Sequence, residues 1–217
     1  MVDFQSRETR RDDEDEAPAE DAAEEPADDP LTEESEPHQH DDEAEHDHDE
    51  HDHHHHDVEH VGVAILTVSS SRSLDDDPAG DAIAAAFEAD GHEVVTRELV
   101  RDSYDRVQGG IDNLAGRGDV DVVVTTGGTG VTPDDVTVEA AEPLFEKTLP
   151  GFGELFRRLS YEEIGEKVVA TRATAGVADG VPVFCLPGSE HAAELGSEAV
   201  VVPEIGHLVG LAGREDA

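Results

Sequence analysis

From residue 61 onward, apolar and polar positions follow patterns that predict strands and helices in turn. Val61–Val68 is a continuous apolar run, which is typical of a strand buried on both faces. After a Ser-rich loop, Asp77-Pro78 is typical of a helix N-terminus, with the aspartate as cap and the proline in the first turn. Apolar residues at helical spacing then continue up to Gly91, a typical helix stop.

The same order repeats in the next segment. His92–Val100 and Val120–Thr126 are both rich in β-branched residues and predict two further strands. The segment between them predicts a helix, with one face formed by Tyr104, Val107, Ile111 and Leu114. A β-α-β-α-β order predicts a mostly parallel sheet with helices on both faces.

The C-terminal half adds helices and a hairpin. Apolar spacing over 152–159 predicts a helix. Ala173–Ala178 and Val181–Leu186 flank Asp179-Gly180, a strong signal for a hairpin turn. A last helical stretch, interrupted by a proline, is expected over Ser189–Leu211. The predicted fold is therefore a three-layer α/β/α domain with a mostly parallel sheet plus a β-hairpin.

Composition divides the chain into two regions. Residues 1–59 hold few large apolar side chains, so they cannot offset the ordering cost of about 1–2 kcal/mol per residue and should be disordered. Residues 60–217 should form the single domain. Within the extension, His46–Asp57 interleaves imidazoles with carboxylates. Such a tract either binds Zn, Ni or Cu loosely or is a solvated low-complexity segment.

The strongly negative net charge excludes some classes of protein. There are 55 acidic and 14 basic residues, a net charge of −41, and the only lysines are Lys147 and Lys167. This balance excludes a conventional nucleic-acid binder, which needs cations against phosphates. Acidic excess in both regions suggests a halophilic source, because self-repulsion is screened in concentrated salt. The alternative is a mesophilic protein with one acidic tail.

Other absences indicate a cytoplasmic protein. No stretch approaches the roughly 18 consecutive apolar residues of a membrane span, and no basic-then-apolar secretory signal is seen. A lone cysteine, Cys185, cannot form an internal disulfide, which fits a reducing compartment. Because it stands within an apolar strand pattern, we expect Cys185 to be inert core.

Candidate chemistry lies in the loops that follow the predicted strands, where open α/β sheets bind ligands. After the third strand come Thr126, Gly127, Gly128, Thr129 and Gly130. Glycines allow backbone N–H groups to approach a phosphate closely, and the threonines add hydroxyls. The alternative to a phosphate-binding loop is a tight turn with a purely structural role.

Carboxylates near these loops favour a divalent cation. Asp134 and Asp135 follow the glycines, and Asp102 follows the second strand. Mg²⁺ is usually held by one or two carboxylates plus substrate phosphates. Taken singly, each of Asp102 and Asp135 is by default interpreted as a helix cap. A further loop, Pro187-Gly188-Ser189, opens a helix, and Ser189 either caps it or joins an anion site.

Several motifs in order resemble the MoaB/MogA family of molybdenum cofactor biosynthesis, more closely its MoaB branch. The resemblance covers roughly residues 61–205 and rests on Thr125–Asp135 with Glu139-Ala140, Pro150–Glu154, Leu159–Gly165 and Leu186–Ser189. It implies a molybdopterin adenylyltransferase, an enzyme that transfers AMP from Mg-ATP to the terminal phosphate of molybdopterin and releases pyrophosphate. It also implies assembly as a homo-oligomer, a trimer or a hexamer.

The resemblance also implies site residues. The family's two functional aspartates fall on Asp102 and Asp135, which we expect to be catalytic and to hold Mg²⁺. Its substrate-binding loops, for ATP and molybdopterin, fall on Ser69, Ser70, Arg72, Thr126, Gly127, Gly128, Thr129, Gly130, Pro187, Gly188 and Ser189.

One departure from the family pattern affects the expected phosphate partners, and membership of the MoaB branch does not by itself imply catalysis. MogA-type members carry an arginine where this chain has Asp134, so Arg72 and Arg101 become the expected phosphate-facing cations. The alternative is a non-catalytic protein that binds or delivers molybdopterin.

Overall fold

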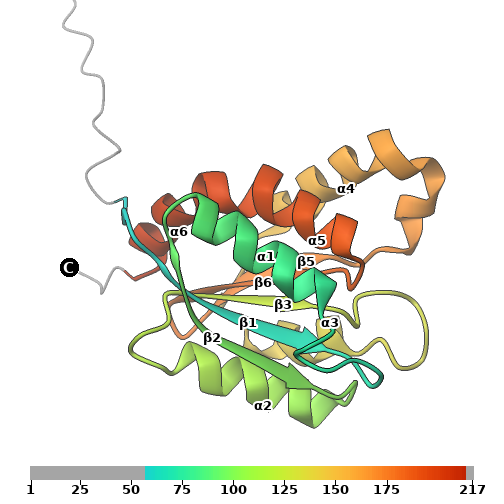
Figure 1. Cartoon of the computed structure of the whole chain (residues 1–217), viewed down its shortest axis with the longest axis horizontal. Coiled ribbons are helices and arrows are strands. Elements are labelled where there is room, and N and C mark those ends of the chain that lie inside the picture. The colour runs from blue at the N-terminus through green and yellow to red at the C-terminus, as the bar shows by residue number, and fades with distance from the viewer. Residues whose placement is uncertain (1–56, 214–217) are drawn as a thin grey trace, which may run out of the picture. The chain divides into compact units, whose positions relative to one another are not determined.

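The computed structural model describes residues 57–213. Residues 1–56 of the predicted disordered extension, which include its His/Asp tract up to residue 56, therefore lie outside the described residues. The domain boundary near residue 60 stays a prediction. The described residues form a sheet covered by helices on both faces, which confirms the predicted three-layer α/β/α class (Figure 1).

A mixed sheet of six strands forms the middle layer, in the order β2-β1-β3-β6-β5-β4. From β2 to β6 each strand is parallel to its neighbour, whereas the β6–β5 and β5–β4 pairs are antiparallel. The strands are β1 Gly62–Val68, β2 Glu93–Val100, β3 Val122–Thr126, β4 Lys147–Thr148, β5 Thr174–Ala178 and β6 Val181–Leu186.

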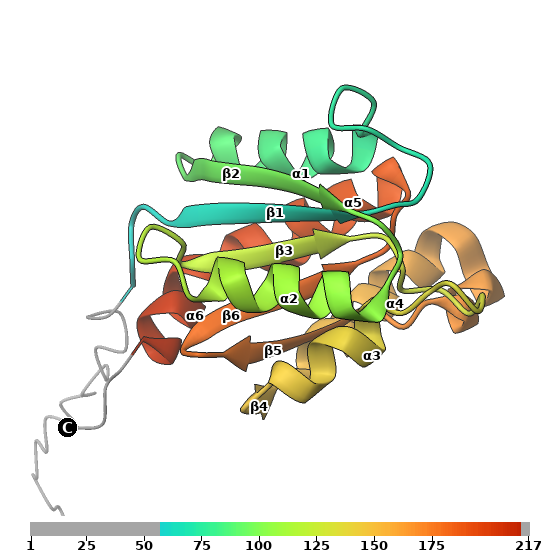
Figure 2. The same cartoon turned by 90° about the horizontal axis from the view of Figure 1, so that it is seen from below.

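Helices form the two outer layers. The α-helices are α1 Pro78–Ala89, α2 Tyr104–Ala115, α3 Thr137–Ala141, α4 Pro150–Ile164, α5 Glu190–Gly196 and α6 Ile205–Ala212. Figure 2 shows α2 and α3 on one face of the sheet, with α1 and α5 on the other. The predicted helices at 104–114 and 152–159 are thus confirmed as α2 and α4.

The alternation of side chains along β1 explains its unbroken apolar run. Ile65 packs in the core cluster that includes Phe87 of α1, whereas Leu66 packs in the cluster that includes Ile111 of α2. All four side chains are fully buried. Burial of each contributes about 1.5–3 kcal/mol, so a polar residue on either face of β1 would be costly.

Two short-range sequence signals are confirmed. The Asp77 carboxylate accepts a hydrogen bond from the Gly80 N–H at 3.1 Å, which caps α1. Asp179 and Gly180 have φ values of 51° and 75°, the left-handed conformations that a tight hairpin turn between β5 and β6 requires.

Two features were not predicted. β4 is only two residues long and both residues are exposed, so the sequence contains no alternation of apolar and polar residues that would predict this strand. The expected C-terminal helical stretch is divided by a π-helical turn, Ser197–Val201, and a 3₁₀ turn, Val202–Glu204. Pro203 lies in the 3₁₀ turn. Because proline lacks the N–H that a continuous α-helix needs, it interrupts the α-helix there.

This helical run, Glu190–Ala212, is the one segment within residues 57–213 that is long and apolar enough to cross a membrane by length and composition. In the structure Ala193, Val201 and Ile205 are fully buried in the cluster that contains Phe87. We therefore interpret the run as a helical layer of the domain.

Strand register places the functional loops together. Thr126 at the end of β3 is paired with Thr67 of β1 on one side and with Leu186 of β6 on the other. Val68 is paired with Val100 at the end of β2. The loops that follow these four parallel strands therefore leave the same edge of the sheet.

Candidate functional site

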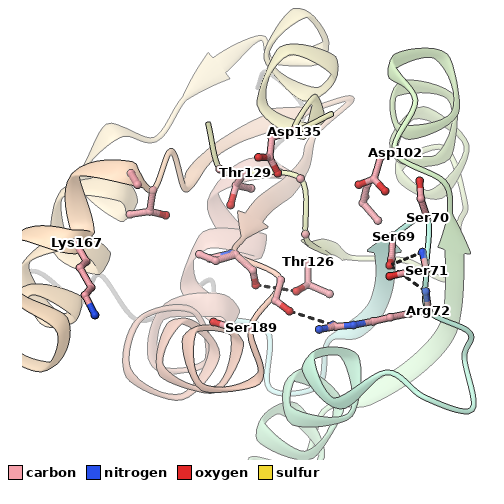
Figure 3. Close-up of a pocket in the computed structure, with 18 residues that line it drawn as sticks. Ser69, Ser70, Ser71, Arg72, Asp102, Thr126, Thr129, Asp135, Lys167 and Ser189 are labelled. Atoms are coloured by element: carbon pink, nitrogen blue, oxygen red, sulfur yellow. Dashed lines mark hydrogen bonds between the residues drawn. The ribbon is translucent and has the colours of Figure 1, made fainter. Parts of the chain in front are cut away.

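A cavity of about 550 Å³ opens at the carboxyl edge of the sheet. Its walls come from the loops after β1, β2, β3 and β6, together with the segment that follows α4 (Figure 3). Every residue expected to bind substrate or metal lines it, namely Ser69, Ser70, Arg72, Asp102, Thr126, Gly127, Gly128, Thr129, Gly130, Asp135, Pro187, Gly188 and Ser189. Residues up to 120 positions apart in sequence thus meet at one place.

The loop after β3 needs its first two glycines for steric reasons. Gly127 and Gly128 have φ values of 99° and 67°, which other residues rarely adopt. A Cβ on Gly127 would also lie 2.2 Å from the Val68 carbonyl oxygen. The turn is closed by Thr137, whose hydroxyl donates to the Gly127 oxygen at 2.8 Å. The tight-loop interpretation is therefore correct, but the loop is also a wall of the cavity.

Some of this loop's polar groups are already engaged. The Gly127 N–H donates to the Leu186 oxygen at 3.0 Å, and the fully buried Thr126 hydroxyl donates to the Pro187 oxygen at 2.9 Å. These bonds connect the loops after β3 and β6. They direct the Thr126 proton away from a ligand, which leaves the amides of Gly128 and Thr129 as the loop's candidates for binding phosphate.

Arg72 connects the loop after β1 to the loop after β6. Its Nη1 donates to the Gly188 oxygen at 3.0 Å, and its own N–H donates to the Ser69 hydroxyl at 3.2 Å. The guanidinium is therefore held at the cavity wall, where its charge is available to an anion. Ser189 caps α5 by accepting from the Ala192 N–H at 3.4 Å, as the capping interpretation predicts.

Neither aspartate is a helix cap. α2 is preceded by Ser103 and α3 by Val136, and neither helix has a side-chain capping bond. Asp102 and Asp135 instead line the cavity from two different loops. In Figure 3 both carboxylates lie along the same side of the cavity.

The carboxylate of Asp135 is held by its own loop. Its Oδ2 accepts from the Thr132 N–H at 2.7 Å and from the Thr132 hydroxyl at 2.6 Å. Partial burial raises the pKa of Asp135, but the hydrogen bonds from Thr132 and Gly130 and the charge of Arg172 outweigh it and hold this pKa below its ordinary value. Asp135 is therefore ionised at neutral pH.

The cations at the cavity differ from those expected. Arg72 lines it, but Arg101 does not, and the second cation is Lys167 from the 3₁₀ segment Gly165–Ala170. Asp134 is exposed and is not part of the wall, so it adds less repulsion than its position in sequence suggests. Lysine is rare in this chain, and that rarity was the only feature of the sequence that could have drawn attention to Lys167. No motif indicated that Lys167 lies at the cavity.

The donor set suits a hard cation that shares its ligands with a substrate. Within residues 57–213 no three His, Cys, Asp or Glu side chains are grouped as a self-contained metal site. Asp102 and Asp135 supply carboxylate oxygens, and Mg²⁺ typically takes its remaining ligands from water and phosphates. The two aspartates therefore fit Mg²⁺ bound together with a phosphate-bearing ligand.

Comparison with known proteins places the sequence and the fold in one family. The family described as "Probable molybdopterin binding domain" matches residues 64–207. Molybdenum cofactor biosynthesis protein B of Halalkalibacterium halodurans is 42% identical over 146 residues, which are 67% of this chain and 86% of that protein.

Two solved structures are also similar. A crystal structure of molybdenum cofactor biosynthesis protein B has a TM-score of 0.70 at 38% identity, over 72% of this chain and 98% of that one. The tungsten cofactor synthesizing protein MoaB from Pyrococcus furiosus has a TM-score of 0.64 at 37% identity, over 72% and 99% of the two chains. The chain belongs to the MoaB/MogA family of molybdenum cofactor biosynthesis proteins.

Proposed function

We propose that the chain is a molybdopterin adenylyltransferase that uses Mg-ATP. In this reaction an oxygen of the terminal phosphate of molybdopterin bonds to the α-phosphorus of ATP. The bond from that phosphorus to the oxygen bridging to the β-phosphate breaks, and pyrophosphate leaves with that oxygen. The observation that carries the proposal is the meeting of Asp102 and Asp135 with three substrate loops in one cavity.

Two anionic reactants must approach each other here, so charge is the main obstacle. Asp102 and Asp135 would hold Mg²⁺, which would neutralise and orient the phosphates. Arg72 and Lys167 add positive charge from two other walls of the cavity. The amides of Gly128 and Thr129 add hydrogen-bond donors for phosphate oxygens. Holding both reactants in line is itself a large part of catalysis.

The proposed reaction needs no protein nucleophile. Cys185 is fully buried and does not line the cavity, and burial raises the pKa of its thiol to about 12. Such a thiol remains protonated at neutral pH and is not nucleophilic. We therefore propose direct transfer between the two substrates, with no covalent intermediate on Cys185.

The alternative is a protein that binds or delivers molybdopterin without AMP transfer. It is favoured by one observation: the Oδ2 of Asp135 already accepts two hydrogen bonds from Thr132, which compete with a metal ion. A single assay separates the two functions. The chain is incubated in concentrated KCl with MgATP and molybdopterin, and pyrophosphate and adenylyl-molybdopterin are both measured.

We expect equal amounts of the two products, and none when either substrate or Mg²⁺ is omitted. Molybdopterin that binds without pyrophosphate release would instead establish the delivery function. If molybdopterin neither binds nor reacts, both functions are contradicted.

We further propose that the chain works in the cytoplasm as a homo-oligomer. The free Cys185 thiol fits a reducing compartment. Support for self-association comes from a mainly apolar groove of about 350 Å³ beside α4, lined by residues that include Leu149, Leu155 and Leu208. Light scattering coupled to gel filtration in concentrated KCl should give a trimer or a hexamer; a 23 kDa monomer would contradict this.

A further inference from the structure

Arg172 makes an unusual set of contacts with the loop that carries Asp135. Its Nε donates to the Gly130 oxygen at 2.7 Å and its Nη2 donates to the Asp135 oxygen at 3.0 Å. The backbone N–H of Arg172 donates to the Thr129 oxygen at 3.0 Å. One residue, outside any strand or α-helix, thus binds three carbonyls of a loop that lies 37 to 43 positions earlier.

The guanidinium is itself anchored. Nη1 forms an ion pair with Glu139 of α3, the helix that follows the loop. Nε, Nη1 and Nη2 of Arg172 therefore all donate at once to different acceptors. Only a planar guanidinium offers this many donors in a fixed geometry, and a lysine ammonium in its place would not span the same acceptors.

Arg172 does not reach the candidate active site directly. It does not line the cavity that contains Asp102 and Asp135 but lines a neighbouring one with Glu139 and Arg157. Its effect on that active site must therefore pass through the loop. The Asp135 backbone is held by Arg172 and the Asp135 side chain by Thr132, so the two sets of bonds together define where the carboxylate lies.

We propose that Arg172 is a positioning residue for adenylyl transfer, which keeps the Gly127–Asp135 loop in the shape that presents Asp135 to the cavity. This inference rests on the proposed function. It assigns to Arg172 a role through another residue, not contact with substrate. A displacement of about 1 Å at a reacting group is enough to cost about 10²-fold in rate.

The test compares three variants with a matched control. Arg172→Ala removes all side-chain contacts of Arg172. Arg172→Lys keeps the positive charge but loses the planar guanidinium and its several N–H donors. Glu139→Gln removes only the ion pair. Arg117→Ala is the control, because Arg117 also forms an ion pair, through two hydrogen bonds to Asp119, but lines no part of the cavity. Each protein is studied at full length in concentrated KCl, by amide hydrogen exchange over 127–136 and by steady-state kinetics.

In Arg172→Ala we expect faster exchange over 127–136 and a 10- to 100-fold lower kcat, with a smaller change in the KM for ATP. Arg172→Lys should resemble Arg172→Ala, because charge alone does not hold the loop. Glu139→Gln should lie between these variants and the wild type. Arg117→Ala should match the wild type in both measurements. Thermal unfolding of each variant shows whether the fold as a whole is retained.

Two results would overturn the proposal: unchanged exchange over 127–136 in both Arg172 variants, or full kcat in Arg172→Lys. A failure of the proposed function is distinguishable, since the wild type itself would then show no turnover. In that event the exchange measurement still decides whether Arg172 holds the loop.

Discussion

Asp135 is held at the cavity by hydrogen bonds, and its immediate neighbour offers a test of its role. Asp134 carries the same charge but is exposed and lies outside the wall. The pair therefore separates the effect of a carboxylate at the site from the effect of net charge. Such separation matters in a chain with a net charge of −41, where removal of any acid relieves repulsion.

We predict that Asp135→Ala lowers kcat for adenylyl transfer by about 10²-fold or more, the scale lost with one electrostatic group at a reacting centre. Asp134→Ala should retain nearly the wild-type rate. Both rates are measured by pyrophosphate release, with circular dichroism to verify the fold. Near-normal turnover in Asp135→Ala, or an equal loss in both variants, would contradict the assignment.

The pKa of Asp135 gives a second prediction for the same residue. Thr132→Val removes the hydroxyl that donates to Oδ2 but leaves the Thr132 N–H in place. Loss of a hydrogen bond to the charged form raises the pKa of Asp135. The acidic limb of the pH–rate profile should therefore move to higher pH.

Stability should change in the same direction. A carboxyl whose pKa is lowered in the folded state stabilises the fold above its unfolded pKa, and this contribution is lost as pH falls through the folded pKa. Thr132→Val raises the folded pKa of Asp135, so this contribution to stability is lost at a higher pH. Acid unfolding should therefore begin at higher pH than in the wild type. An acidic limb that stays in place or moves to lower pH would show that the hydroxyl does not control Asp135.

At the scale of elements, the loop after β3 combines a steric requirement with a functional one. A Cβ on Gly127 would meet the Val68 backbone oxygen at 2.2 Å, and the φ of 99° is itself unfavourable for alanine. Gly151, near the N-terminus of α4, has nothing within 4 Å of its potential Cβ. The two glycines form a matched pair for substitution.

We predict that Gly127→Ala lowers the free energy of unfolding by about 1–3 kcal/mol or more, because strain and overlap with the backbone add. Gly151→Ala should be neutral or stabilise by up to about 1 kcal/mol, as alanine favours helix. Denaturant titrations at fixed KCl measure both. Equal stability of Gly127→Ala and the wild type would mean that the loop relaxes at no cost.

Most elements were predictable from the sequence because their signals are local. The apolar run of β1, the Asp77 cap of α1 and the Asp179-Gly180 turn each depend on neighbouring residues alone. β4 was missed, since its two exposed residues carry no pattern. The helix-cap alternatives for Asp102 and Asp135 were wrong because spacing does not show which loop a carboxylate faces.

The candidate site was only partly predictable for the same reason. Loops after parallel strands meet at one sheet edge, so the set that includes Asp102 and Asp135 followed from topology and resemblance. Arg172 was missed because its partners are distant in sequence. Lys167 was missed because it reaches the cavity from a 3₁₀ segment that no motif marks. Arg172 acts on backbone carbonyls, which every residue possesses, so its partners leave no signal in the sequence.

For the molecule as a whole, the acidic excess predicts stability that depends on salt. Repulsion among charges is strong in dilute buffer, where the Debye length is about 30 Å at 0.01 M, and weak at 1 M, where it is about 3 Å. The midpoint of thermal unfolding should therefore rise steadily with KCl. Equal stability with and without salt would contradict a halophilic origin.

We propose that nucleotide and pterin share a cavity in which Asp102 and Asp135 bind one Mg²⁺. A crystal structure with ATP and Mn²⁺, which is located by anomalous scattering, tests this proposal. We predict a single metal peak within direct ligand distance of both carboxylates and of the ATP phosphates. A metal bound elsewhere, or a nucleotide outside the cavity, would show that Asp102 and Asp135 do not form the proposed magnesium site.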